Sequence, residues 1–284
     1  MMRTQLECFP CFLRQTLIAL GQKPYAPDAR IRREILNDVL SIMLKADTGT
    51  PPAHTTTLIH RTIRERLGFD PFKEIKCEYN SLAMGLYDTL KSEVESSKDP
   101  LWTAARLAIA GNVIDFGIFT SIDIDGSVRR ALDLPIGVDD YPAFRESVRG
   151  AEEILYLLDN AGEIVFDMLL IEQLVSSGKR VLAAVKGSPV LNDVTHEDAL
   201  QTGLTELCRV IDNGSDAVGT MLGWTSPEFQ GAFHTADLVI SKGQGNFETL
   251  AGNEKRTFFL FQSKCEVVSD ELGLPLGSML LKKS

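Results

Sequence analysis

The sequence predicts an α/β protein in which an N-terminal all-helical subdomain, residues 1–112, precedes a Rossmann-like α/β subdomain, residues 113–284, with a largely parallel sheet. Up to about Asn112, apolar residues recur only at the three- and four-residue spacing of helices. From Glu153 onward, short apolar runs alternate with amphipathic segments, which favours parallel strands joined by right-handed crossovers. Four of these runs also end in charged or amide residues close to glycine, which indicates a site at one edge of the sheet.

Three helical stretches are predicted in the N-terminal half. Apolar positions three or four residues apart extend over residues 31–43 and 58–67. Asp70-Pro71 opens another long stretch that continues through Leu90 and ends in a polar run before Pro100. No convincing strand pattern occurs in this half.

Five apolar runs are predicted strands of the C-terminal half. They span residues 154–158, 181–185, 207–211, 238–241 and 257–261, and Val267-Val268 is expected at the same edge as the fifth run. The segment from Ile164 to Val175 is amphipathic and predicts a helix after the first strand. Thr195 and Ser226 are expected to cap two further helices, the second with Pro227 at its first position.

The composition describes an ordinary globular protein. The chain has 284 residues, 44% of them apolar and 24% charged, with a net charge of -10. This acidic balance argues against nucleic acid as a partner, and no run of about 18 apolar residues predicts a membrane span. Without an apolar leader segment, a cytoplasmic location is expected. Five cysteines, an odd number, do not indicate a disulfide framework. The sequence gives no oligomeric state.

The polar strand ends suggest a metal site beside an anion. Asp159 and Asn160 follow the first strand in a glycine-containing turn, and Asp193 leaves the neighbouring strand. Carboxylate and amide oxygens are the ligands that Mg²⁺ and Mn²⁺ prefer, often with a substrate phosphate completing the shell. The alternative is that Asp159-Asn160 only forms a turn and that Asp193 only flanks a helix.

Four motifs in order along most of the chain resemble those of the metal-dependent damage-control phosphatases, catalogued as domain of unknown function 89. The motifs run from Ala110 to Gly117, from Asp159 to Glu163, from Lys186 through Asn192-Asp193-Val194-Thr195, and from Lys242 to Glu248. The N-terminal Cys8-Phe9-Pro10-Cys11 resembles the cysteine pair of that family's prokaryotic branch. The family's fold is a helical subdomain joined to an α/β subdomain, as the pattern itself predicts.

The resemblance implies a role for each matched residue. Asp159, Asn160 and Asp193 would hold the metal, with Asn112 and Asp115 nearby, and Lys242 would contact the phosphate. Backbone amides of Gly243 and Gly245 would add to the phosphate site, with Lys186, Glu163 and Asn246 as further substrate contacts or as supporting and capping residues. The metal would be Mg²⁺, Mn²⁺, Co²⁺ or Ni²⁺.

The expected activity is hydrolysis of small phosphorylated metabolites, either sugar phosphates or damaged phospho-metabolites. A metal-bound water is the favoured nucleophile, and Asp115 is the alternative through a phospho-enzyme. Two other functions stay open: an S-adenosylmethionine-dependent carboxyl methyltransferase and a non-catalytic metal- or metabolite-binding module. The first strand lacks the Gly-x-Gly-x-x-Gly cradle of dinucleotide folds, which weighs against the methyltransferase.

Two further motifs have competing interpretations. Asp123-Ile124-Asp125-Gly126-Ser127 imitates the nucleophile motif of haloacid-dehalogenase-type phosphatases, but it lacks a preceding buried strand and is expected to be a loop between the subdomains. Cys8 and Cys11 can pack in a helix, hold a second, structural metal, or act in redox chemistry. A metal there would need partners, of which Cys77 is favoured and His54 or His60 are possible.

Overall fold

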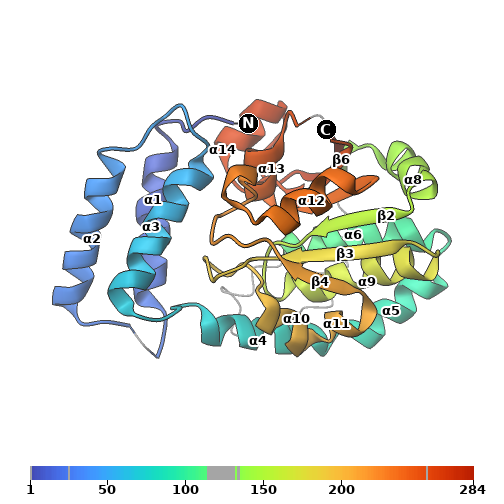
Figure 1. The fold of residues 1–284 in the computed structure, drawn as a ribbon, viewed down its shortest axis with the longest axis horizontal. Helices are drawn as coiled ribbons and strands as arrows, with labels where there is room; N and C mark the ends of the chain where they lie inside the picture. Colours follow the sequence, from blue (N-terminus) through green and yellow to red (C-terminus); the bar gives the residue numbers. More distant parts are fainter. Residues whose placement is uncertain (1, 25, 114–131, 133–134, 254) are drawn as a thin grey trace.

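A seven-stranded sheet with helices on both faces forms the larger part of the structure, and three helices stand together at one end of it (Figure 1). The computed structural model describes residues 2–24, 26–113, 132, 135–253 and 255–284. The helices are α1 (Cys8–Gly21), α2 (Ala29–Met43), α3 (Pro52–Leu67), α4 (Lys73–Met84), α5 (Tyr87–Ser96), α6 (Pro100–Val113), α8 (Tyr141–Gly150), α9 (Glu163–Ser176), α10 (His196–Thr202), α11 (Leu204–Leu207), α12 (Pro227–Thr235), α13 (Gln244–Leu250) and α14 (Glu266–Leu272). The strands are β1 (Ile136–Asp139), β2 (Glu153–Leu157), β3 (Arg180–Val185), β4 (Arg209–Asp212), β5 (Leu238–Lys242), β6 (Thr257–Gln262) and β7 (Met279–Lys283).

The strand order is β1-β7-β6-β5-β2-β3-β4. Strands β6, β5, β2, β3 and β4 are all parallel, so their carboxyl ends lie at the same edge of the sheet. Strand β7 runs antiparallel to β6. Strand β1 pairs in parallel with β7 at the margin, so it also runs opposite to the five central strands. The predicted parallel sheet with polar strand ends along one edge is therefore confirmed for β2 to β5.

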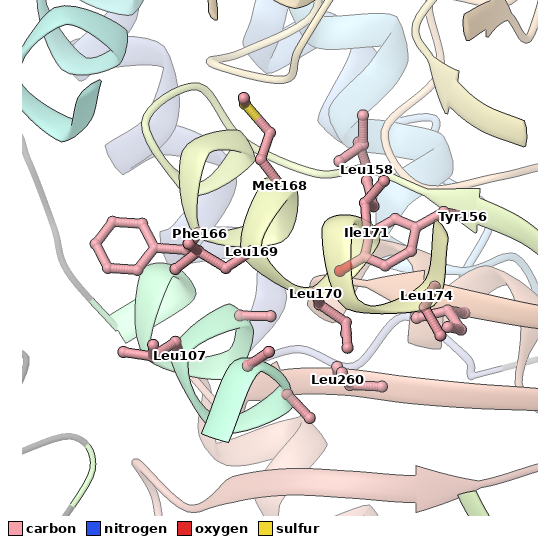
Figure 2. Close-up of a cluster of buried hydrophobic side chains, with 14 of the residues drawn as sticks. Leu107, Tyr156, Leu158, Phe166, Met168, Leu169, Leu170, Ile171, Leu174 and Leu260 are labelled. Atoms are coloured by element: carbon pink, nitrogen blue, oxygen red, sulfur yellow. The ribbon is translucent and has the colours of Figure 1, made fainter. Parts of the chain in front are cut away.

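Successive side chains of the central strands point to opposite faces of the sheet and pack into two separate apolar cores. On one face, Tyr156 and Ile240 pack with α6 and α9, and Figure 2 shows the apolar side chains of α9 meeting Leu107 of α6 and Leu260 of β6. On the other face, Leu155 and its neighbours pack beneath α12, α13 and α14. Because both faces are covered, these strands read as continuous apolar runs in the sequence.

The N-terminal helices divide into two groups. Helices α1, α2 and α3 share their own apolar core, whereas α4, α5 and α6 contribute to the core on the α9 face of the sheet. Residue 112 lies near the end of α6, so the predicted boundary between 112 and 113 marks where the helical stretch of the sequence ends. The spatial division comes earlier in the chain, after α3 (Figure 1).

Several predicted elements differ from the structure. Val267-Val268 is not in a strand: that prediction is wrong, because Cys265 caps α14 and both valines lie in its first turn. The long stretch after Asp70-Pro71 is broken into α4 and α5 at Gly85-Leu86. Strands β1 and β7 were not expected. The caps at Thr195 and Ser226 are confirmed, the first as a capping box with Asp198.

In the part of the chain that the structure describes, none of the helices combines the length and apolar character needed to cross a bilayer.

Candidate active site at the carboxyl edge of the sheet

Backbone pairing joins the two segments that carry the predicted metal ligands. The Asp159 carbonyl accepts a hydrogen bond from Val194 N at 2.9 Å, and Ala161 N donates to the Asn192 carbonyl at 2.9 Å. Asn160 and Asp193 thereby form an antiparallel bridge beyond the ends of β2 and β3. The three predicted ligands, Asp159, Asn160 and Asp193, are thus brought together on a hydrogen-bonded frame.

Gly243 makes room for the carboxylate of Asp159. It follows β5 with φ 79° and ψ 156°, a conformation that is essentially confined to glycine. A Cβ atom at this position would lie 2.1 Å from both Cγ and Oδ2 of Asp159. Glycine is therefore required here by backbone conformation and by the close approach of a site carboxylate.

Burial and neighbouring charge raise the pKa of two carboxylates at this edge, Asp159 and Asp193. Burial raises the pKa of Asp159 well above its ordinary value, and the neighbouring carboxylates of Glu163 and Asp193 raise it further. Burial also raises the pKa of Asp193 to about 6, against the opposing effect of Lys186. A cation between these groups would favour their charged forms.

The arrangement of polar atoms fits an oxygen-liganded cation. Asp193 Oδ2 is buried and accepts no hydrogen bond from the described residues, although Lys186 Nζ lies 3.3 Å away. The Asn160 side chain donates through Nδ2 to Asp159 Oδ2 at 2.5 Å and to Glu163 Oε2 at 3.1 Å, so Oδ1 is the atom of this amide that could bind a cation. Within residues 2–113 and 132–284, as far as the structure describes them, no three His, Cys, Asp or Glu side chains converge in a metal-binding group. The candidate donor set would consist of two carboxylates and one amide.

Lys242 is buried in the interior rather than at the surface of the site. It is fully inaccessible to solvent, and its Nζ donates to Glu163 Oε1 at 2.6 Å, Asp167 Oδ1 at 2.7 Å and the Ala108 carbonyl at 2.8 Å. Burial alone would lower the pKa of this ammonium, but the carboxylates of Asp167 and Glu163 outweigh burial and raise it. All three ammonium hydrogens have acceptors within the protein.

Lys186 and Asn246, two other predicted substrate contacts, form hydrogen bonds within the protein. Lys186 is nearly inaccessible, and its Nζ donates to the Gly219 carbonyl at 2.5 Å beside Asp193. Asn246 Nδ2 donates to the Lys242 carbonyl at 2.7 Å and Oδ1 accepts from Thr220 Oγ1 at 2.7 Å. These contacts hold the segment after β4 against α13.

Asp159, Asn160 and Asp193, the three predicted ligands, line a cavity of about 480 Å³. The lining residues at the sheet edge, here called the floor of the cavity, include Asp159, Asn160, Asp193 and Gly245. Residues of α1 and of the start of α3 also line it. Apolar side chains such as Phe12, Val218 and Val267 line its sides. The cavity thus lies between the helical end of the molecule and the carboxyl edge of the sheet.

Two cations that the sequence analysis did not single out line this cavity, Arg14 of α1 and Lys264. Lys264 follows β6, its side chain is exposed, and its charge opposes the rise in the pKa of Asp159. The signal that could have found it is its place just beyond the fifth predicted strand, at the same edge as the other four. Lys264 thus lines the cavity together with Asp159, Asn160 and Asp193, whereas Lys242, the lysine predicted to contact the phosphate, does not.

Glu248 is a buried acid in the same cavity wall. Its side chain is 7% exposed, and burial raises its pKa to about 7 despite a hydrogen bond of 2.9 Å from Gln244 Nε2. It belongs to the motif that begins at Lys242, one helical turn beyond Gly245. It was not among the candidate residues.

The cysteine pair at the start of α1 faces the cavity. Cys8 and Cys11 line it together with Cys265, and burial raises the pKa of all three thiols. The proposed partners Cys77, His54 and His60 are not among the described residues that line the cavity. Cys77 Sγ accepts from Gln201 on α10, His60 packs against Phe72, and His54 packs against Trp224. A structural metal at Cys8 and Cys11 stays a prediction.

Three predictions concern residues outside the description. Asp115 and the Asp123 to Ser127 segment lie among residues 114–131, which the structure does not describe. Asn112 lies in α6, but its side chain is likewise outside the described part. Their proposed roles stay predictions.

Comparison with known proteins decides the family. Residues 4–280 match the family model of the damage-control phosphatase ARMT1-like domain. The chain belongs to this family. A damage-control phosphatase of Pyrococcus horikoshii is 37% identical to this chain over 100% of its length and 99% of the relative's. A damage-control phosphatase of Archaeoglobus fulgidus is 32% identical, with 97% of each chain covered.

The fold of this ARMT1-like domain is also found in a solved structure. The crystal structure of a DUF89 family protein from Pyrococcus horikoshii superposes with a TM-score of 0.92 at 37% identity, covering 100% of this chain and 99% of that one. The helical region and the mostly parallel sheet are therefore features shared with the family.

Proposed function

We propose that this protein is a metal-dependent phosphatase, a phosphoric monoester hydrolase acting on sugar phosphates or damaged phospho-metabolites. The observation that carries the proposal is the meeting of Asp159, Asn160 and Asp193 at the floor of a cavity that also presents Lys264. The relatives named damage-control phosphatases cover the whole chain, which supports the same activity.

The residues have distinct tasks in this proposal. Asp159, Asn160 and Asp193 would hold one divalent ion, Mg²⁺, Mn²⁺, Co²⁺ or Ni²⁺, through oxygen. When bound, that ion would polarise a phosphoryl oxygen and lower the pKa of a water. Lys264 attracts the phosphate and offsets its charge, and Lys186 offsets the charge of Asp193 from below.

The cavity sets the size of the substrate. Its volume of about 480 Å³ is within the ~300–1,000 Å³ range of small-molecule sites. Its walls mix apolar side chains with Gln15, Gln244 and Glu248, which can hydrogen-bond hydroxyl or amide groups. We infer that the leaving group is a small polar metabolite rather than a macromolecule.

The test is phosphate release from a panel of sugar phosphates and phosphorylated cofactors, with each divalent metal in turn. We expect Asp193→Asn to reduce kcat/KM at least about 100-fold, because one ligand charge is lost while the side-chain shape is kept. Lys264→Met should raise KM about 10- to 100-fold, the loss of one charge-assisted hydrogen bond. Lys45→Met, an exposed lysine at the end of α2, is the matched control and should leave KM unchanged.

Two results would contradict the proposal. One is turnover that chelators do not reduce. The other is a protein that releases phosphate from nothing on the panel but is stabilised against heat by S-adenosylmethionine, which would favour the methyltransferase.

A further inference from the structure

Lys242 ends β5 within a closed set of polar contacts. Its ammonium has three hydrogens, and three protein acceptors lie at hydrogen-bond distance: Glu163 Oε1 at 2.6 Å, Asp167 Oδ1 at 2.7 Å and the Ala108 carbonyl at 2.8 Å. The side chain is fully buried and is not among the described residues lining the cavity. A phosphate in the cavity therefore finds no donor on Lys242.

Glu163 contacts both Lys242 and Asn160, a residue at the floor of the cavity. It is the first residue of α9 and is 1% exposed. While Oε1 accepts from Lys242, Oε2 accepts from Asn160 Nδ2 at 3.1 Å. One carboxylate thus connects the buried ammonium with the amide of the candidate metal site.

Charge decides which way the Asn160 amide points. Its Nδ2 lies between Glu163 Oε2 and Asp159 Oδ2, two carboxylate oxygens at 3.1 Å and 2.5 Å. An amide oxygen in that place would be repelled by both, so the NH₂ group occupies it and Oδ1 is directed elsewhere. This orientation leaves the amide oxygen for a cation.

We propose that Lys242 is a positioning residue: its buried ammonium fixes Glu163, which orients Asn160 so that Oδ1 binds the metal. The proposal rests on the metal site of the proposed function and deepens it. It assigns Lys242 to the support of a ligand instead of to the phosphate. A supporting hydrogen bond of this kind changes metal affinity by about 10- to 100-fold.

The sharpest variant is Glu163→Gln, which keeps the shape of the side chain. The glutamine Oε1 still accepts from Lys242, and its NH₂ group then faces Asn160, which favours rotation of the Asn160 amide and removes Oδ1 from the metal. Lys242→Met is less useful, because it leaves buried carboxylates without their cation and endangers folding. Asp167→Asn is the matched control, since Asp167 contacts Lys242 but not Asn160.

The measurement is Mn²⁺ binding to the substrate-free protein by calorimetry or electron paramagnetic resonance, with thermal melting in chelator as a check on folding. Glu163→Gln should weaken Mn²⁺ binding about 10- to 100-fold with an unchanged melting profile, and Asp167→Asn should bind within about threefold of wild type. Equal loss in both variants, or no loss in Glu163→Gln, would overturn the positioning role. A wild-type protein that binds no divalent cation would overturn this role and the proposed metal site together, whereas normal Mn²⁺ binding without phosphatase activity would overturn only the proposed reaction.

Discussion

Glu248 titrates within the physiological range because its carboxyl group is buried. Its pKa of about 7 in the folded protein exceeds the ordinary value of 4.5. Between these pH values the folded state keeps a proton that the unfolded state has released, so this residue's contribution to stability is lost as pH rises. Between pH 4.5 and pH 8, we predict that the free energy of unfolding falls by about 1–3 kcal/mol more in the wild type than in Glu248→Gln, whose side chain does not titrate. Urea unfolding across that range measures it, and parallel curves for the two proteins would contradict it.

At the residue scale, the sequence predicted which oxygen-bearing side chains lie together better than it predicted which lysine lines the cavity. Asp159, Asn160 and Asp193 lie together because residues after parallel strands meet at one edge, a consequence of topology alone. Lys242 ends β5 and Lys264 follows β6 at that edge, and these positions in the sequence do not show which lysine lines the cavity. What separates them is that Glu163 and Asp167 enclose one ammonium in the interior, while the other lysine lies in the wall of the cavity. Such contacts depend on packing between distant elements.

At the element scale, the turn from β5 into α13 depends on one glycine. In Gly243→Ala the added Cβ would overlap the Asp159 carboxylate in a backbone conformation that alanine strongly disfavours. We predict at least about a 10-fold loss of Mn²⁺ affinity and a loss of about 1–3 kcal/mol in unfolding free energy. Gly231→Ala is the matched control: it lies exposed within α12 with open space around it, and should stabilise the protein by about 0.5–1 kcal/mol. Unchanged Mn²⁺ binding in Gly243→Ala would show that Asp159 can move without loss.

Elements with strong local signals were predicted, and those defined by distant partners were not. The central strands are buried on both faces and therefore appear as apolar runs, and Ser226 and Thr195 identify helix starts by local chemistry. Strand β1 is only four residues long, contains a glycine, and alternates between half-buried and exposed positions. Val267-Val268 was misread because two adjacent valines suit a strand, whereas the cap at Cys265 selects a helix.

At the scale of the whole molecule, Asp216 ties the N-terminal helices to the sheet edge. It accepts from Arg61 Nη2 at 2.6 Å and Nε at 2.9 Å, and from Arg64 Nη2 at 2.6 Å, both on α3. The Arg61 hydrogen bond holds the pKa of Asp216 below its ordinary value of 3.8. This contribution to stability is therefore present above pH 3.8 and is lost as pH falls through the lower, folded-state value.

We predict that Asp216→Asn lowers the free energy of unfolding by about 1–2 kcal/mol at pH 7, because Arg61 is partly exposed and its share is screened. The difference from wild type should shrink as the pH is brought below 3.8. Glu146→Gln, which breaks an exposed pair with Arg149, is the control and should cost less than about 0.5 kcal/mol. Urea unfolding at pH 7 and pH 3 tests the size of the effect and its pH dependence. Equal losses of unfolding free energy in the two variants would contradict a stabilising role for Asp216.

The place of β7 between β1 and β6 also governs the order in which the molecule can assemble. In the sheet, β1 pairs only with β7, yet Ile136 leaves the ribosome long before Met279. At about 5–20 residues per second, translation separates the two strands by on the order of ten seconds. Strands β2 to β6 are synthesised within that interval, so all five precede β7, the partner of β1 among the described strands. The order of synthesis therefore allows the parallel strands that carry the candidate site to pair before β7 and β1 complete the margin of the sheet.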